Sequence, residues 1–133
     1  MAETFVLDSS AMLTLMGDED GADRVQEVLE TAHVLIPWTV LAEVYYITQQ
    51  KLGQNAADLR YAAIRRLDAE FPSDIPESIL LTASRWKAVH RMSFADSLIA
   101  AYASQSAATL LHKDPEFEAL QDQVSLEALP YKA

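Results

Sequence analysis

Short apolar runs alternate with longer helical patterns along this chain. Four runs have the length and composition of buried strands, and they cover residues 5–7, 34–36, 109–111 and 124–129. Residues 71–76 form a poorer strand, which two prolines would restrict to the edge of a sheet. Helical patterns fill most of the segments between them, at residues 9–16, 20–32, 38–52, 55–70, 77–89 and 93–104. This alternation predicts an α/β fold, with a parallel sheet of about five strands and helices on both faces.

The size and composition of the chain narrow its class. With 133 residues, we expect a single domain over residues 1–133. Half of the residues are hydrophobic, which argues against a disordered protein. No apolar run approaches the roughly 20 residues of a membrane span, and no basic segment precedes an apolar stretch as in a signal peptide. Cysteine is absent, which excludes disulfides and thiolate metal sites and favours a cytoplasmic protein.

Acidic residues outnumber basic ones. The chain has 20 Asp and Glu against 10 Lys and Arg, and its formal net charge is −10. A protein that coats nucleic acid would be basic. Any nucleic acid must therefore be bound locally, through a positive patch or through metal ions, while the acidic surface would suit a basic protein partner.

The segment Thr4-Phe-Val-Leu-Asp8-Ser-Ser10-Ala11 passes from a buried strand into a polar cluster. In an open α/β sheet, ligands bind beyond the carboxyl ends of the strands, so Asp8 falls where an acid can take part in chemistry. The alternative is structural, because Asp and Ser before a helix commonly cap its first turn. On this segment alone, the cap is the favoured interpretation.

Glu43 lies inside the helical pattern at 38–52, where capping is not available. It is the only charged residue in the first three turns of a helix that is apolar almost all round. A partly buried carboxylate is unfavourable unless it is paired or binds a metal. Glu43 is therefore a candidate site residue, and the alternative is a salt bridge to an Arg or Lys of another helix.

Two further acids also have structural alternatives. Ser93-Phe-Ala-Asp96 matches a capping box, and Asp114 before Pro115 matches a helix cap followed by proline. Caps that follow parallel strands lie at the carboxyl edge, so capping and a shared site do not exclude each other. Clustered carboxylates repel one another unless a cation neutralises them, and oxygen ligands favour Mg²⁺ or Mn²⁺. We therefore expect a magnesium-type site formed by four acids: Asp8, Glu43, Asp96 and Asp114.

In their order and spacing, four motifs resemble those of the PIN domain family, and within it the toxin ribonucleases of the VapC type. Asp8-Ser-Ser10 resembles the opening motif, and Glu43 stands where the family has its helical glutamate. Residues 93–101 (SFADSLIAA) resemble the third acidic motif and are the most specific part, and residues 110–117 (LLHKDPEF) resemble the fourth. The resemblance covers essentially the whole chain.

The resemblance implies a Rossmann-like PIN fold with about five parallel strands and an acidic pocket at their carboxyl edge. It also implies a Mg²⁺- or Mn²⁺-dependent endoribonuclease. Many family members are toxins held inactive by an antitoxin, and many form homodimers. Ser10 would then orient Asp8 or a metal-bound water, and the alternative is a turn hydroxyl that bonds its own backbone. The catalytic and metal-binding residues implied are Asp8, Glu43, Asp96 and Asp114.

Basic residues beside the third and fourth motifs are candidates for phosphate contacts with RNA. Arg91 lies just ahead of the third motif, and Lys113 adjoins Asp114. The alternative is an ordinary basic surface that balances nearby acids.

Two residues of the fourth motif have open roles. Many relatives have Thr or Ser where this chain has His112. The histidine would position water or phosphate, or it is an exposed loop residue, which is the favoured interpretation. Glu116 is either an extra ligand or a solvated acid in the first turn of a helix, where it favours the helix dipole; the second is slightly favoured.

Three other functions stay open on the sequence. A phospho-receiver module also has an acidic Mg²⁺ pocket, but it needs an Asp ending a middle strand and a late Lys, of which the chain offers only Lys113. A non-catalytic PIN-like domain that binds RNA or protein would not need all four acids. A purely structural account treats the acids as caps plus one salt bridge and predicts only weak metal association at the surface.

Overall fold

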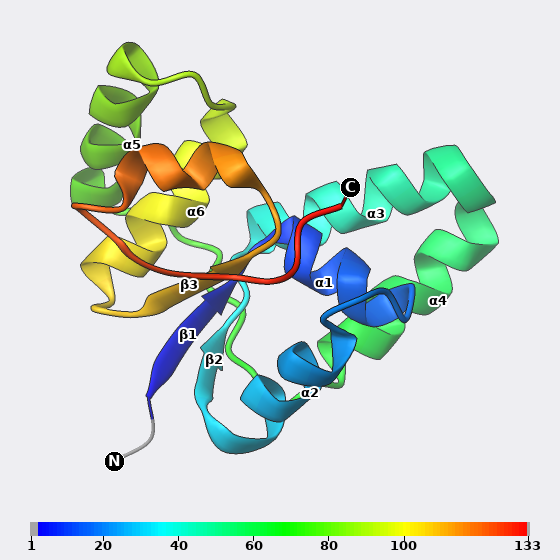
Figure 1. Cartoon of the computed structure of the whole chain (residues 1–133). Helices are drawn as coiled ribbons and strands as arrows, with labels where there is room; N and C mark the ends of the chain where they lie inside the picture. The colour runs from blue at the N-terminus through cyan, green and yellow to red at the C-terminus, as the bar shows by residue number, and fades with distance from the viewer. Residues whose placement is uncertain (1–2, 133) are drawn as a thin grey trace.

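A parallel sheet of four strands lies at the centre of the computed structural model, which describes residues 3–132 (Figure 1). The strands follow the order β2-β1-β3-β4 across the sheet, and all neighbours are parallel. β1 and β3 are the two central strands, and their last three residues are all buried. The strands are β1 (Thr4–Leu7), β2 (His33–Leu35), β3 (Thr109–His112) and β4 (Ser125–Ala128).

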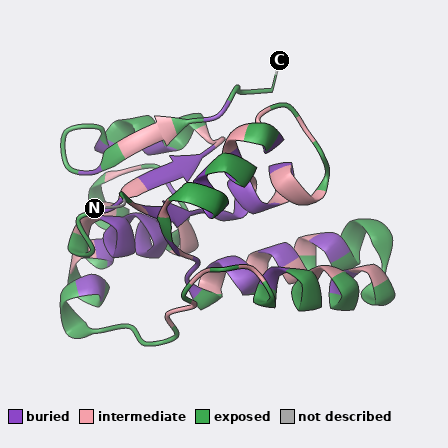
Figure 2. Ribbon diagram, turned by 90° about the horizontal axis from the view of Figure 1, so that it is seen from below, coloured by how far each residue is buried: buried purple, intermediate pink, exposed green. Residues whose placement is uncertain are grey.

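Helices cover both faces of the sheet. α6 contacts β1 and β3 on one face and carries α5 on its outer side, while α1 and α2 cover the other face (Figure 1). α3 and α4 pack against each other as a helical hairpin that extends from the body of the protein, with largely exposed outer faces (Figure 2). The helices are α1 (Ser9–Met16), α2 (Ala22–Thr31), α3 (Trp38–Leu52), α4 (Gln54–Arg65), α5 (Glu77–Val89), α6 (Phe94–Gln105) and the 3₁₀ helix η1 (Pro115–Leu120).

Residues with strong local preferences set the helix boundaries that matter for the site. Asp8 caps α1, Ser93 caps α6 and Asp114 caps η1, each through a side-chain oxygen that accepts a backbone N–H bond. Gly53 joins α3 to α4 with a φ of 93°, a conformation that side chains other than glycine rarely adopt. The capping residues Asp8 and Asp114 thus lie just after the ends of β1 and β3.

The main apolar core lies between the sheet and the helices that cover it. α6 is rich in alanine, and Ala100 and Ala103 are fully buried in this core. Because alanine has a short side chain, the α6 backbone lies close to the sheet. α6 thereby holds its first turn, which contains Asp96, near the ends of the central strands.

The expected edge strand at residues 71–76 is wrong. Pro72 and Pro76 lack the backbone N–H groups that pairing with a neighbouring strand needs. Residues 71–76 are not a strand in the structure. Instead, Glu70 forms an isolated bridge with Leu35 at the edge of the sheet. This bridge also explains why α4 ends at Arg65 rather than near residue 70, since the chain must leave the helix to reach the sheet.

No helix within residues 3–132 combines the length and the hydropathy that a bilayer crossing requires.

Candidate metal centre

The carboxyl ends of the two central strands bring the first and fourth motifs together. Leu7 of β1 pairs with Leu111 of β3, and the backbone N–H of Asp8 donates to the Leu111 carbonyl at 3.2 Å. The residues that follow these strands therefore leave the sheet side by side. Asp8 and Asp114 are separated by more than one hundred positions in the sequence but belong to the same edge.

Asp8 is buried, with 2% of its surface exposed. Its carboxylate accepts the backbone N–H of Ala11 at 2.8 Å and the hydroxyl of Ser10 at 2.7 and 2.8 Å. Burial raises the pKa of Asp8 to about 7, with a smaller contribution from the charges of Asp96 and Asp114 and despite the opposing effect of the hydrogen bonds. Asp8 is thus both the cap of α1 and a charged group of the site.

Ser10 joins the two strand ends. Its hydroxyl donates to Asp8 and accepts the backbone N–H of Lys113 at 2.8 Å. One side chain therefore fixes the Asp8 carboxylate and the turn that carries Asp114. The hydroxyl bonds groups of two separate segments, a pattern that the simple turn interpretation of Ser10 does not require.

Glu43 lies on the first turns of α3 and is half-buried. The hydroxyl of Ser9 donates to Glu43 Oε1 at 2.6 Å, which links the start of α1 to α3. Among residues 3–132, no Lys, Arg or His pairs with Glu43, so the interhelical salt bridge considered for it is not observed. The sequence did not predict this role of Ser9, because a hydroxyl residue after a strand is commonly part of a turn.

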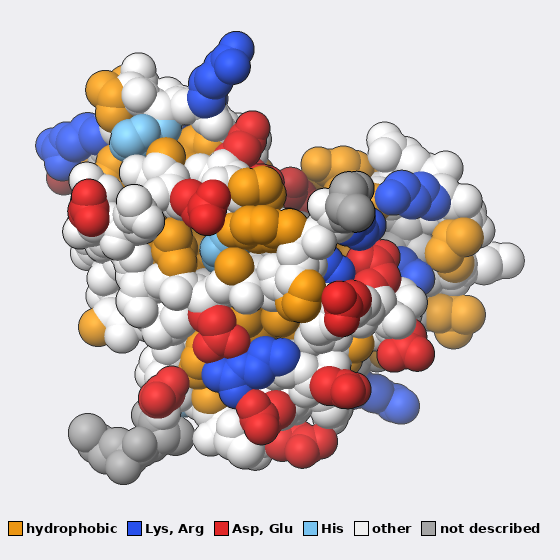
Figure 3. Space-filling model, in the orientation of Figure 1, with side chains coloured by type: hydrophobic (Ala, Val, Ile, Leu, Met, Phe, Trp, Pro, Cys, Tyr) orange, Lys and Arg blue, Asp and Glu red, His pale blue; other side chains and the backbone are white. Residues whose placement is uncertain are grey.

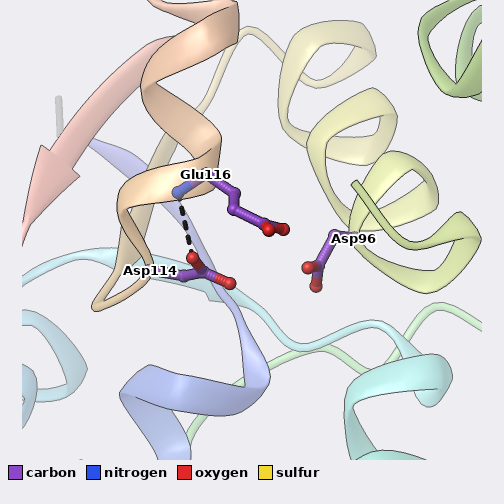
Figure 4. Close-up of side chains that lie close together, drawn as sticks. All are labelled: Asp96, Asp114 and Glu116. Atoms are coloured by element: carbon purple, nitrogen blue, oxygen red, sulfur yellow. Dashed lines mark hydrogen bonds between the residues drawn. The ribbon is translucent and has the colours of Figure 1, made fainter. Parts of the chain in front are cut away.

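Asp96, Asp114 and Glu116 bring their carboxylates together (Figure 4). One oxygen atom from each lies within 4.8 Å of the other two. Asp96 comes from the first turn of α6, and the other two come from the start of η1. Figure 4 shows the Glu116 side chain reaching across towards Asp96, while its backbone N–H donates to Asp114 Oδ1 at 2.9 Å.

The acids of this cluster carry like charges that no basic side chain among residues 3–132 neutralises. Burial raises the pKa of Asp96 to about 7, and the charges of Glu43, Asp114 and Glu116 act in the same direction. Within the described part of the chain, none of these carboxylates forms an ion pair with a basic side chain. Crowded carboxylate oxygens without a protein cation are the donor set that Mg²⁺ and Mn²⁺ prefer, so the residues present fit a divalent metal.

The sequence profile of the PIN domain family matches residues 5–123, a range that contains all five acids. The chain belongs to the PIN domain family. No curated protein sequence matches it significantly.

Solved structures of similar fold include a VapC toxin and VapBC complexes. VapBC2 from Rickettsia felis, bound to promoter DNA, has a TM-score of 0.77 at 16% identity, over 96% of this chain and 99% of that chain. VapC20 from Mycobacterium tuberculosis, a sarcin–ricin loop cleaving toxin, has a TM-score of 0.71 at 16% identity; the match covers 86% of this chain and 93% of VapC20. VapBC-1 from nontypeable Haemophilus influenzae has a TM-score of 0.70 at 19% identity; the match covers 94% of this chain and 97% of that chain. At these identities, the likeness establishes a shared fold.

The expectation that His112 is an exposed loop residue is wrong for this PIN domain. It is the last residue of β3, pairs with Ala128 of β4 and has 1% of its surface exposed. Phe117 and Tyr131 cover its ring, with centroids 5.1 and 6.2 Å away. Its Nδ1 accepts the backbone N–H of Asp114 at 3.1 Å. Burial lowers the pKa of His112, so a neutral ring supports the turn that presents Asp114.

The two basic residues proposed for phosphate contacts have different surroundings. Arg91 is exposed and lines a cavity of about 320 Å³ together with Lys87, Ser93 and Glu116, beside the acid cluster. The Lys113 side chain is only 5% exposed. Its ammonium donates to the Asp20 carbonyl at 2.7 Å and lies 3.6 Å from Glu19. Arg91 is therefore free to meet a ligand, whereas Lys113 would first have to leave these partners.

Proposed function

We propose that this PIN domain, spanning residues 1–133, is a metal-dependent endoribonuclease that hydrolyses RNA phosphodiester bonds. One observation carries the proposal. One carboxylate oxygen from each of Asp96, Asp114 and Glu116 lies within 4.8 Å of the other two. No basic side chain among the described residues forms an ion pair with these carboxylates. RNA is the substrate that the comparison favours, since VapC20, which shares the fold, cleaves the sarcin–ricin loop.

Five acids and two serines would divide the work. Asp8, Glu43, Asp96 and Asp114, with Glu116, would hold Mg²⁺ or Mn²⁺. Such an ion lowers the pKa of a bound water and stabilises negative charge on a phosphodiester. Ser10 donates to the Asp8 carboxylate and Ser9 to that of Glu43, so these two proposed ligands would be oriented before metal or RNA binds.

The proposal extends to partners. Several solved structures of similar fold are toxin–antitoxin complexes, including those from Rickettsia felis, Haemophilus influenzae and Klebsiella pneumoniae. We therefore assign this chain as the toxin of a type II pair, inhibited by an antitoxin, homodimeric, and active on RNA in the cytoplasm. The net charge of −10 is suited to a basic antitoxin.

RNA cleavage tests the proposal directly. The partner-free chain is incubated with total cellular RNA in Mg²⁺, Mn²⁺ or EDTA, beside Asp96→Asn and the matched control Asp68→Asn, an exposed acid outside the cluster. We expect cutting that requires metal, is lost in Asp96→Asn and is retained in the control. Cutting that persists in EDTA, or equally in Asp96→Asn, would contradict the assignment.

A metal titration separates a nuclease from a binding domain or a purely structural role for the acids. At 100 times its dissociation constant, a bound ion stabilises the folded state by about 2.7 kcal/mol, which for a domain of this size raises Tm by roughly 10 °C. We expect this rise with Mn²⁺ in the wild-type chain and its loss in Asp96→Asn. Metal binding without any RNA cleavage would favour the non-catalytic domain, and no specific metal binding would favour the structural account.

A further inference from the structure

A cavity of about 470 Å³ lies next to the acid cluster, between α1, the α3–α4 hairpin and the C-terminal segment. Ser10 and Asp114 belong to its lining, so the cavity shares a wall with the candidate metal centre. This volume is within the range of about 300–1,000 Å³ that is typical of small-molecule sites. The cavity is therefore large enough for one nucleotide and is continuous with the place where a scissile phosphate would lie.

The cavity has the opposite charge balance from the rest of the protein. Of the 10 Lys and Arg residues in the chain, four line it, against the carboxylates of Glu19 and Asp114: Lys51, Arg60, Lys113 and Lys132. Figure 3 shows basic side chains gathered beside α3 on the face that it presents, with acids below them. In a chain with a net charge of −10, this concentration of cations marks an anion site.

Two of the four cations are available to a ligand. Lys113 and Lys132 lie 3.6 and 3.4 Å from Glu19 and are partly neutralised by it. Lys51 and Arg60 form no ion pair with any residue between 3 and 132. The Arg60 guanidinium donates to the hydroxyl of Thr48 at 3.2 Å, and Thr48 is buried, so this cation is held in a fixed position.

The remaining walls suit a base and a ribose. Leu13, Ile47 and Pro115 supply apolar surface. The ring of Tyr131, 38% exposed, also lines the cavity and can stack on a base. An acidic peptide would use the cations but would gain little from a flat aromatic ring, so the walls favour a nucleotide.

We infer that this cavity binds the nucleotide adjacent to the scissile phosphate of an RNA substrate, with Lys51 and Arg60 on its phosphate and Tyr131 against its base. The inference rests on the proposed ribonuclease activity, because only an RNA strand cut at the acid cluster would pass its next nucleotide into this cavity. The cavity would thereby help to determine which RNA segments are cleaved.

RNA binding measured without metal tests the inference apart from catalysis. Fluorescein-labelled octauridylate and octaadenylate are titrated in EDTA at 25–200 mM NaCl by fluorescence anisotropy. The variants are the pair Lys51→Gln and Arg60→Gln, and the control pair Arg65→Gln and Arg66→Gln, which removes the same charge from the end of α4, outside the cavity lining. Thermal unfolding of each variant confirms that it folds.

We expect the cavity pair to weaken binding at least tenfold at 50 mM salt and to flatten the plot of log affinity against log salt by about 0.7, since the two cations neutralise one phosphate and each neutralised phosphate contributes about 0.7 on single strands. The control pair should stay within twofold of the wild type. Equal effects of the two pairs, or no RNA binding by the wild type, would overturn the inference. So would tighter binding of a fluorescein-labelled octaglutamate that the cavity pair abolishes, because the cavity would then belong to a protein partner.

The outcomes distinguish this inference from the proposed function. Binding that depends on Lys51 and Arg60, without any metal-dependent cleavage, would overturn the nuclease and leave an RNA site. Cleavage that depends on Asp96, with equal binding by the two variant pairs, would overturn the nucleotide site alone. In an active enzyme, the cavity pair should raise KM more than it lowers kcat, because these contacts bind substrate and transition state alike.

Discussion

The acids of the site form two groups that the fold treats differently. Asp8 and Glu43, the inner acids, are held by short hydrogen bonds from serines of α1. Asp96, Asp114 and Glu116, the outer acids, face one another within 4.8 Å. The inner acids are thus oriented by hydroxyl groups of α1. The outer acids have no such side-chain donor from α1, although Asp114 also caps η1, and they repel one another unless a cation or a proton intervenes. In the proposed metal centre, the outer acids would therefore gain most from a bound cation, and the serine hydrogen bonds would orient the inner acids.

Removing an outer acid should have the largest effect. In Asp114→Asn, we expect RNA cleavage to fall by about 1,000-fold, because a metal supplies several kcal/mol of charge stabilisation in the transition state. The metal-free chain should be at least as stable as the wild type, since a repulsive charge beside Asp96 is gone and Asn can still cap η1. Cleavage rates and urea unfolding in EDTA measure the two effects. A variant that loses both activity and stability would mean that Asp114 acts through the fold.

Asp8 of the inner group and Asp96 of the outer group should both contribute to the pH dependence of stability, because burial raises the pKa of each to about 7. Asp8 has a pKa of about 7 in the folded protein against an ordinary value of 3.8, so the folded state binds the proton more tightly. The free energy of unfolding of the metal-free chain should therefore fall as pH rises from about 4 to 7, by roughly 4 kcal/mol for Asp8 alone, and then level off. Below pH 4 this contribution is fully present.

Urea unfolding in EDTA at pH 5, 6, 7 and 8 checks this dependence. Asp8→Asn has no ionisable group at this position, so its stability should depend less on pH than that of the wild type. A metal-free wild type that becomes more stable between pH 5 and 8 would contradict the raised pKa of Asp8.

A smaller effect should follow from the hydroxyl that joins the strand ends. Ser10→Ala removes the bond to Asp8 and leaves the backbone N–H of Lys113 without its partner. We expect a loss of roughly 2 kcal/mol in stability and a 10- to 100-fold weaker affinity for Mn²⁺. Calorimetric metal titration and urea unfolding measure these. Ser106→Ala, at an exposed helix end, is the control; equal effects of the two variants would remove Ser10 from the site.

The smallest effect should come from the most exposed outer acid. Glu116→Gln keeps the size of the side chain and removes one charge near Asp96. We expect at most a tenfold loss of Mn²⁺ affinity and a change in stability below about 0.5 kcal/mol, as is usual at the surface. A loss of activity as large as that of Asp114→Asn would move Glu116 from an accessory ligand to an essential one.

Much of the fold could be predicted because local signals mark its boundaries. The structure places α3 and α5 at the bounds predicted from the sequence, since Pro37 and Gly53 enclose one helix and Pro76 precedes the other. The alternation of apolar runs and helical patterns also predicted the parallel sheet. The segment 71–76 misled because a loop that bridges to a sheet edge through Glu70 has the same apolar content as a weak strand.

The site residues that could not be predicted depend on contacts distant in sequence. His112 looked like a loop residue because a polar residue after the apolar pair Leu110-Leu111 normally ends a strand, yet pairing with β4 and the ring of Tyr131 bury it. Glu116 is exposed in the first turn of η1, as the sequence favoured. Its position opposite Asp96 could not be predicted, because it requires the placement of α6. Periodicity describes one element at a time, and these positions are defined by two.

The caps at the sheet edge have a consequence for how such a protein can change. Asp8 and Asp114 each satisfy a free backbone N–H at the start of a helix, and asparagine serves this purpose about as well as aspartate. A single Asp-to-Asn change would therefore abolish the proposed activity while the fold is retained. Descendants of this chain that have lost their activity should remain well-folded proteins, whose surfaces are then open to selection for recognition alone.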